Sequence, residues 1–231
     1  MKKFFLLSLL LVSTLGANAE QLTSQPQLDD LISPDEIAEE LGFPRTEMGV
    51  EVLSYDDFYK SEAANLISEY PLVVIINKSN RGPTAQTLVM YENGFQTSVW
   101  QVSTGRERWE LAKSGRRYFS ATPVGYFYPY QLVRNHYSHT WKANMEFSVF
   151  FNGGVAVHAT TPDHYKELGT RASGGCVRLL KENAEYFYRQ IEAHGKGLMP
   201  VIKRDGTVSK DRWGNPVRAI KWKTLIVVIN E

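Results

Sequence analysis

The chain has 231 residues, with 26 basic and 25 acidic side chains and a formal net charge of +1. This balance excludes recruitment of nucleic acid or of an anionic membrane by bulk electrostatics, because both need a clustered excess of basic charge. Hydrophobic residues make up 43% and charged residues 22%, which is typical of a globular protein. The length predicts one domain with extensions, or one medium domain plus a small one.

The N-terminus has the pattern of a secretory signal peptide. Lys2 and Lys3 precede an apolar run over residues 4–15, and Ala17-Asn18-Ala19 fits a small-residue cleavage site. The run is too short to span a bilayer comfortably, which disfavours an uncleaved anchor. We therefore predict that residues 1–19 are removed and that the mature chain is exported to the periplasm or cell envelope, without stable membrane insertion.

The segment that follows, residues 20–70, is predicted to be a small helical lead-in. Its first part, residues 20–32, is polar and is expected to be loose. Ser33-Pro34-Asp35-Glu36 is a capping box with proline at the first helical position, and the helix it begins should end at Gly42. A second helix is predicted over residues 56–68.

From residue 71 onward the sequence is mainly that of a β protein. The run at 72–77 is typical of a buried strand, and Asn93-Gly94 predicts the turn of a hairpin within 87–105. Gly153-Gly154 predicts a second hairpin within 147–160, and 224–230 is a further strand. The stretch 134–141 is expected to be a loop. One helix follows residue 180, with an apolar stripe of Ala184, Phe187, Tyr188 and Ile191.

Cys176 is the single cysteine of the chain. In an exported protein an unpaired cysteine indicates an intermolecular bridge or a reactive thiol, and the alternative is a buried cysteine that acts as a small apolar residue. The adjacent Gly174-Gly175 pair allows a close approach of the backbone to a ligand. The backbone amides of Gly175 and Cys176 are candidates to stabilise a developing oxyanion.

A reactive thiol needs a base within hydrogen-bond reach. His158 is the strongest candidate, because it ends a predicted strand that would hold it rigidly. The other histidines have ordinary explanations: His136 and His139 in the predicted loop, His164 in a surface turn, and His194 at a helix C-terminus.

These residues match a known pattern. The stretch VAVHATTPDHYKELGTRASGGCVRL resembles the active-site signature of the YkuD-type L,D-transpeptidases, with fourteen residues between His158 and Ser173. TPVG at 122–125 resembles a second family segment. Where the family usually has histidine before Gly-Cys, this chain has Gly174, so its motif is Ser-Gly-Gly-Cys. The resemblance covers about residues 71–204.

The resemblance implies a fold and a domain order. It predicts a mainly β, L,D-transpeptidase-like β-sandwich with one helix packed near the active-site cysteine, preceded by the small helical lead-in. Residues 71–204 would form the catalytic domain, and residues 205–231 a C-terminal extension with a final strand.

The resemblance also implies an activity on peptidoglycan stem tetrapeptides. Cys176 would form a thioester that is passed to an amine acceptor, with His158 as the base and with Gly175 and Cys176 as the oxyanion hole. Arg178 and Ser173 are predicted to bind substrate, and the alternative for Arg178 is a structural ion pair near the start of the helix. No cofactor or metal is expected. The acceptor would be a second stem (a 3–3 cross-link), a free D-amino acid or a lipoprotein lysine; the sequence leaves the choice open, along with the oligomeric state.

Other interpretations also remain open. Water as the acceptor would give an L,D-carboxypeptidase or endopeptidase, and loss of activity would leave a non-catalytic peptidoglycan-binding module. Three further classes fit less well. A sortase has different spacings, a papain-like enzyme has its cysteine before its histidine, and a zinc site of His158, His164 and Cys176 lacks a recognisable spacing.

Overall fold

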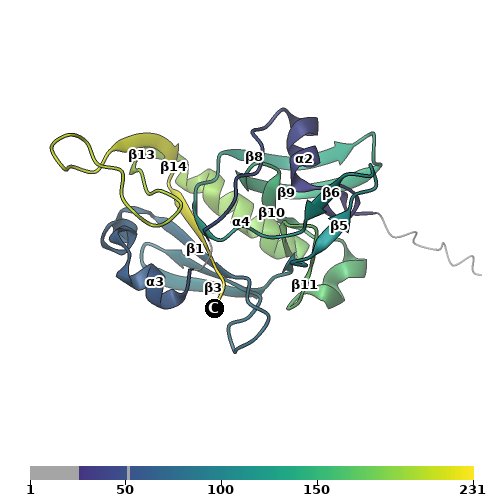
Figure 1. Cartoon of the computed structure of the whole chain (residues 1–231). Coiled ribbons are helices and arrows are strands. Elements are labelled where there is room, and N and C mark those ends of the chain that lie inside the picture. The colour runs from purple at the N-terminus through teal and green to yellow at the C-terminus, as the bar shows by residue number, and fades with distance from the viewer. Residues whose placement is uncertain (1–25, 51–52) are drawn as a thin grey trace, which may run out of the picture.

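The computed structural model describes residues 26–50 and 53–231. The predicted signal peptide, residues 1–19, lies outside the described residues. Within those residues, no helix has the length and apolar character needed to cross a membrane. Strands dominate the structure, as Figure 1 shows, which confirms the mainly β fold class.

The larger sheet has five strands and contains both the first and the last strand of the described residues. Its order is β3 (Phe95–Gln101), β2 (Thr87–Glu92), β1 (Leu72–Asn77), β15 (Thr224–Ile229) and β7 (Gly125–Phe127). β15 pairs in parallel with β1 and antiparallel with β7. The end of the chain is therefore an internal strand of the sheet.

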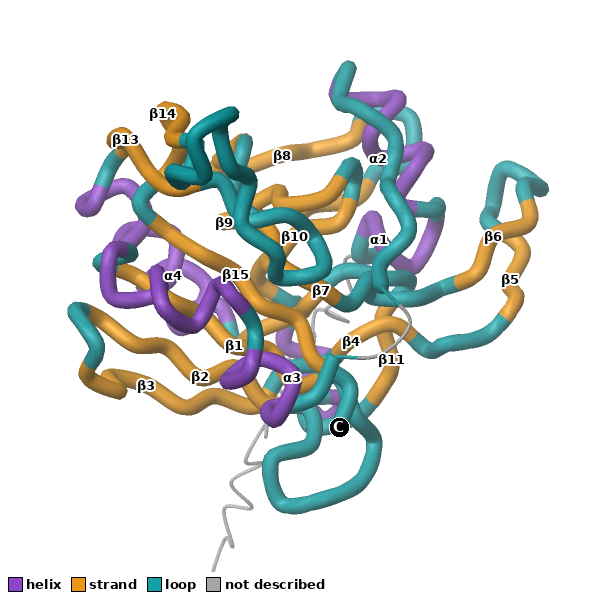
Figure 2. The backbone as a smooth tube through the Cα atoms, turned by 60° about the vertical axis from the view of Figure 1, so that its left-hand side comes forward, coloured by secondary structure: helices purple, strands orange, loops and turns teal. Residues whose placement is uncertain are grey.

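The second sheet has four strands and carries the site described below. Its order is β12 (Val177–Leu179), β10 (Val155–Ala159), β9 (Ala143–Asn152) and β8 (Gln131–Ser138). Helix α4 (Lys181–His194) packs against β9 and β10, and Figure 2 shows it between the two sets of strands. Side chains of both sheets and of α4 form one buried apolar cluster, so the sheets and the helix share a core.

Three two-stranded pairs and one short helix complete the domain. β4 (Thr104–Gly105) pairs with β11 (Arg171–Ser173), β5 (Trp109–Leu111) with β6 (Arg117–Phe119), and β13 (Lys196–Pro200) with β14 (Arg218–Trp222). The 3₁₀ helix η2 (Pro162–Glu167) lies between β10 and β11.

The N-terminal part is helical: α1 (Leu28–Leu31), α2 (Pro34–Leu41), α3 (Tyr55–Lys60) and the 3₁₀ helix η1 (Glu62–Glu69). The predicted capping box is present, since the Ser33 hydroxyl accepts from the Glu36 amide and the Glu36 side chain accepts from the Ser33 amide. Gly42 ends α2 in the left-handed conformation, as predicted.

Three local predictions were wrong. The helix expected over 56–68 is divided at Ser61, where the Ser61 hydroxyl donates to the Phe58 carbonyl. The loop expected over 134–141 is in part strand β8, paired with β9. Residues 27–32, expected to be loose, are mostly buried and contain α1.

Candidate active site

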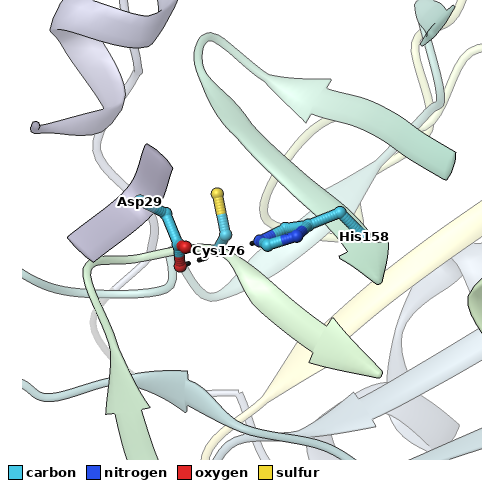
Figure 3. Close-up of side chains that lie close together, drawn as sticks. All are labelled: Asp29, His158 and Cys176. Carbon is cyan, nitrogen blue, oxygen red and sulfur yellow. Dashed lines mark ion pairs between the residues drawn. The ribbon is translucent and has the colours of Figure 1, made fainter. Parts of the chain in front are cut away.

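Two adjacent parallel strands bring the predicted catalytic residues together. β10 pairs with β12 so that His158 lies opposite Arg178, and Cys176 directly precedes β12. The sulfur of Cys176, a ring nitrogen of His158 and a carboxylate oxygen of Asp29 lie within 4.8 Å of one another. Figure 3 shows the three side chains, with Asp29 contributed by helix α1, which is distant in sequence.

Hydrogen bonds within the loop before Cys176 fix its backbone. The Ser173 hydroxyl donates to the Cys176 carbonyl at 2.5 Å and accepts from the Gly175 amide at 3.1 Å. The Thr122 hydroxyl donates to the Gly175 carbonyl at 2.8 Å. Gly175 has φ +140°, which favours glycine at this position. Ser173 thus supports the loop, and the predicted oxyanion donor Gly175 is engaged by Ser173 in this structure.

The imidazole of His158 is oriented by the backbone. Its Nδ1 lies 2.8 Å from the Ala159 carbonyl oxygen, which can only accept, so Nδ1 carries a proton. Nε2 is then the nitrogen available to take a proton from a thiol. The Asp29 carboxylate lies 3.6 Å from that Nε2, in front of the nitrogen that catalysis would use.

The thiol of Cys176 is completely buried. Its sulfur lies 3.5 Å from the Ala156 amide and 3.6 Å from the Gly154 carbonyl oxygen, and in Figure 3 it is directed away from the imidazole. Burial, and then the negative charge of Asp29, raise the pKa of the Cys176 thiol far above its ordinary value. This arrangement therefore favours the protonated thiol, which is a weaker nucleophile than the thiolate.

Arg178 is also fully buried, and three carboxylates surround it. Its guanidinium pairs with Asp29 at 2.9 Å, with Asp30 at 2.6 Å and with Glu167 at 3.2 Å. Burial disfavours the charged guanidinium, but the attraction of Asp29 and Asp30 outweighs it and raises the pKa of Arg178. The same balance holds for Asp29, where burial opposes ionisation but Arg178 and His158 lower the pKa.

We call residues 27–43 the covering segment, because they pack directly on this site. The carbonyl oxygen of Asp29 lies against Gly174, where an added Cβ would come within 1.9 Å of it. The carbonyl oxygen of Pro34 lies equally close to Gly154, at 1.8 Å from the corresponding Cβ position. Backbone of the covering segment thus meets backbone of the site loops without intervening side chains.

The trio of Asp29, His158 and Cys176 carries the donor types of a metal site. The guanidinium of Arg178 nevertheless lies 2.9 Å from the Asp29 oxygen nearest to His158. A cation placed among these donors would be repelled by that charge, so the arrangement is better explained as an ion-pair network.

The remaining histidines have partners of their own. His136 lies 3.2 Å from Glu40, His164 lies 3.0 Å from Glu167, and His194 lies 3.1 Å from Glu92. His139 packs edge-on against Tyr137. The geometry therefore favours His158 as the partner of Cys176.

Sequence reasoning missed the acidic residues of the site and one hydroxyl. Asp29 and Asp30 stand in a stretch without a recognisable motif, and Glu167 is one of several charged residues in η2. Thr122 belongs to the TPVG segment, for which the sequence indicates a family resemblance but no role. Its bond to Gly175 gives that segment a structural role.

Comparison with known families is consistent with this geometry. Residues 71–217 match the model of the L,D-transpeptidase catalytic domain (YkuD), which is more than half of the chain. The chain therefore belongs to the YkuD L,D-transpeptidase family. No curated protein matched the sequence.

Solved structures of L,D-transpeptidases show similarity at low identity. An L,D-transpeptidase from Xylanimonas cellulosilytica is 22% identical with a TM-score of 0.45, covering 84% of this chain and 68% of its own. One from Stackebrandtia nassauensis is 19% identical with a TM-score of 0.45, covering 77% and 61%. One from Mycobacterium smegmatis is 16% identical with a TM-score of 0.44, covering 68% and 58%. For the latter two, the chain spans about three fifths of the relative's length.

Proposed function

We propose that the protein is an exported, cysteine-dependent L,D-transpeptidase that acts on peptidoglycan stem tetrapeptides in the cell envelope. The observation that carries the proposal is the β10–β12 pairing, which brings His158 of β10 close to Cys176, directly before β12, within one family domain. Residues 71–204 would form the catalytic domain, with the final strand of the 205–231 extension completing its sheet.

The reaction would pass through a thioester. His158 Nε2 takes the proton of Cys176, and the thiolate attacks the carbonyl of the third stem residue. The C–N bond to the terminal D-alanine breaks, and His158 returns the proton to the departing amine. An acceptor amine then attacks the thioester, gives its proton to His158 and regenerates the thiolate. A second stem, a D-amino acid or a lipoprotein lysine would each serve as acceptor.

Backbone and charged groups would support the charged states of this reaction. The amides of Gly175 and Cys176 would hold the oxyanion, with the Gly175 amide exchanging its bond from Ser173 to the substrate. Arg178 would bind a donor carboxylate in a bidentate manner. Ser173 would act by holding the loop.

The buried thiol also favours a second candidate, a non-catalytic module that binds peptidoglycan. In that case Cys176 would stay protonated and the stem peptide would bind without reaction. One experiment separates the two. The full mature chain is incubated with a carbapenem or with a stem tetrapeptide, and its intact mass is followed.

We expect an adduct in the wild type and none in Cys176→Ala. Release of D-alanine without cross-linked product would identify water as the acceptor. Peptide binding without any adduct would instead identify the binding module. Muropeptide analysis of cells with and without the protein would then establish which acceptor is used.

A further inference from the structure

We propose that the covering segment, residues 27–43, is a built-in inhibitor that occupies the donor site, with the Asp29 carboxylate in the place of a donor carboxylate on Arg178. This inference rests on the proposed function for the identity of the donor, but the covering itself is argued from contacts alone.

The first line of argument is the position of Asp29. Its carboxylate is 2.9 Å from Arg178 and 3.6 Å from His158 Nε2, so one group engages both the predicted substrate-binding cation and the predicted base. The Asp29 side chain is itself almost completely buried. A peptide donor that presents a carboxylate to Arg178 would have to replace it.

The second line is the backbone contact. Asp29 and Pro34 place carbonyl oxygens against Gly174 and Gly154, where any Cβ would collide with them. Pro34 also lies 2.9 Å from the Cβ position of Gly175. The glycine-containing loops of the site therefore contact the backbone of the covering segment closely, as a groove would contact a peptide substrate.

The third line is the apolar seal around the thiol. Leu28, Ile32 and Ile37 of the covering segment share a buried cluster with Cys176, and Figure 2 shows α1 and α2 beside β10. The other buried members of the cluster come from β9 and β10: Ala143, Met145, Phe150 and Ala156. Because the sulfur is completely buried, a substrate carbonyl cannot reach it until part of this cluster moves, and Leu28, Ile32 and Ile37 belong to the segment proposed to withdraw.

Polar contacts at both ends keep the covering segment in place. The Thr160 hydroxyl donates to the Gln27 side chain at 2.7 Å, and the Lys113 amide donates to the Leu31 carbonyl at 2.7 Å. Arg116 of the β5–β6 turn pairs with Glu39 at 2.6 Å. None of these three contacts involves a residue of β10 or β12, as release of the covering segment requires.

The test uses the full mature chain and the reaction of Cys176 with a small alkylating reagent. Because Cys176 is the single cysteine, each mass increase reports this thiol. Ile37→Asp places a charge in the apolar cluster and should expel the covering segment. We expect alkylation at least about tenfold faster than in the wild type. Met48→Asp is the matched control, because Met48 is 89% exposed and lies outside the covering segment.

Two further measurements sharpen the test. A synthetic peptide of residues 26–43, added to Ile37→Asp, should slow alkylation again, and the same peptide with Asp29→Asn should protect less. If Ile37→Asp fails to fold, Ile37→Ala in the full chain should accelerate alkylation relative to Met48→Ala, because it shortens a buried side chain of the covering segment without changing a charge near the thiol.

The possible results distinguish two hypotheses: that the covering segment blocks access to Cys176, and that the protein catalyses the proposed transpeptidase reaction. Alkylation of the wild type as fast as in the urea-unfolded chain would overturn the proposal, and so would a folded Ile37→Asp that reacts no faster than Met48→Asp. Faster alkylation together with faster carbapenem acylation would support inhibition of the donor site. Faster alkylation with no acylation would support the covering but overturn both the transpeptidase assignment and the inhibitory role.

Discussion

Replacing Gly174 by alanine adds a single methyl group at the contact between the site loop and the covering segment. The new Cβ would lie 1.9 Å from the Asp29 carbonyl oxygen and 3.1 Å from the Tyr118 hydroxyl. A carbon–oxygen contact needs about 3.3 Å, so the Asp29 backbone must retreat by about 1.4 Å. Gly174 has no left-handed φ, and alanine therefore introduces no backbone strain of its own.

The steric clash caused by this methyl group should displace the covering segment rather than the site loop. Hydrogen bonds from the Ser173 and Thr122 hydroxyls hold the loop backbone, and in the proposal above the covering segment is the part that moves. Overpacking typically costs about 1–3 kcal/mol, which corresponds to roughly a 5- to 150-fold larger open population. We expect the alkylation rate of Cys176 in the native protein to rise by that factor.

The control for this substitution is Gly197→Ala. Gly197 also lacks a left-handed φ, and its Cβ would meet only the flexible side chain of Lys223, at 2.9 Å. Intact-mass kinetics of alkylation and thermal unfolding should be measured for both variants. If Gly174→Ala reacts no faster than Gly197→Ala while both stay folded, the Asp29 backbone does not rest on Gly174 and the reasoning is refuted.

Three further predictions concern the catalytic pair. Cys176→Ala should keep the fold, since a small apolar side chain replaces a buried thiol, and should abolish thioester formation; turnover of a tetrapeptide donor by this variant would contradict the nucleophile assignment. His158→Ala should slow carbapenem acylation by about a hundredfold or more, whereas His164→Ala should have little effect, as followed by adduct mass. Burial raises the pKa of Cys176, so the folded chain keeps a proton that the unfolded chain loses above about pH 8.5. The contribution of this thiol to the free energy of unfolding is therefore complete below that pH and decreases as the pH rises above it. Urea unfolding between pH 7 and 10 should show a decrease in the free energy of unfolding with pH that Cys176→Ala lacks.

The sequence predicted correctly those elements whose conformation depends mainly on residues close together in the chain. Asn93 and Gly94 both adopt positive φ, as the predicted hairpin turn requires, and the apolar stripe of α4 is buried. The helix over 56–68 failed because tertiary contact overrides propensity: after Ser61, the Ala63 amide donates to the distant Gly206 carbonyl. β8 was missed because many of its side chains are polar and face solvent at the edge of the sheet.

The candidate site was predictable only in part, for a similar reason. The residues next to Cys176 in the sequence, and its spacing from His158, identified these two residues. The ion pair between Arg178 and Asp29 joins residues 149 positions apart, and no local pattern encodes such a contact. Asp29 lies in a short polar stretch that is buried only because it packs on the site around Arg178, and its own sequence does not indicate this contact.

Gly174, the position at which the sequence is predicted to differ from the family motif, is also explained by contact with the covering segment. Gly174 and Gly154 both lack a left-handed φ, so neither is required by its own backbone conformation. Both instead face carbonyl oxygens of the covering segment at distances that exclude any side chain. A histidine at 174 would be incompatible with the Asp29 backbone as it lies here. Close docking of the covering segment is therefore a structural reason for glycine at position 174 of this chain, independent of any role of that position in the chemistry.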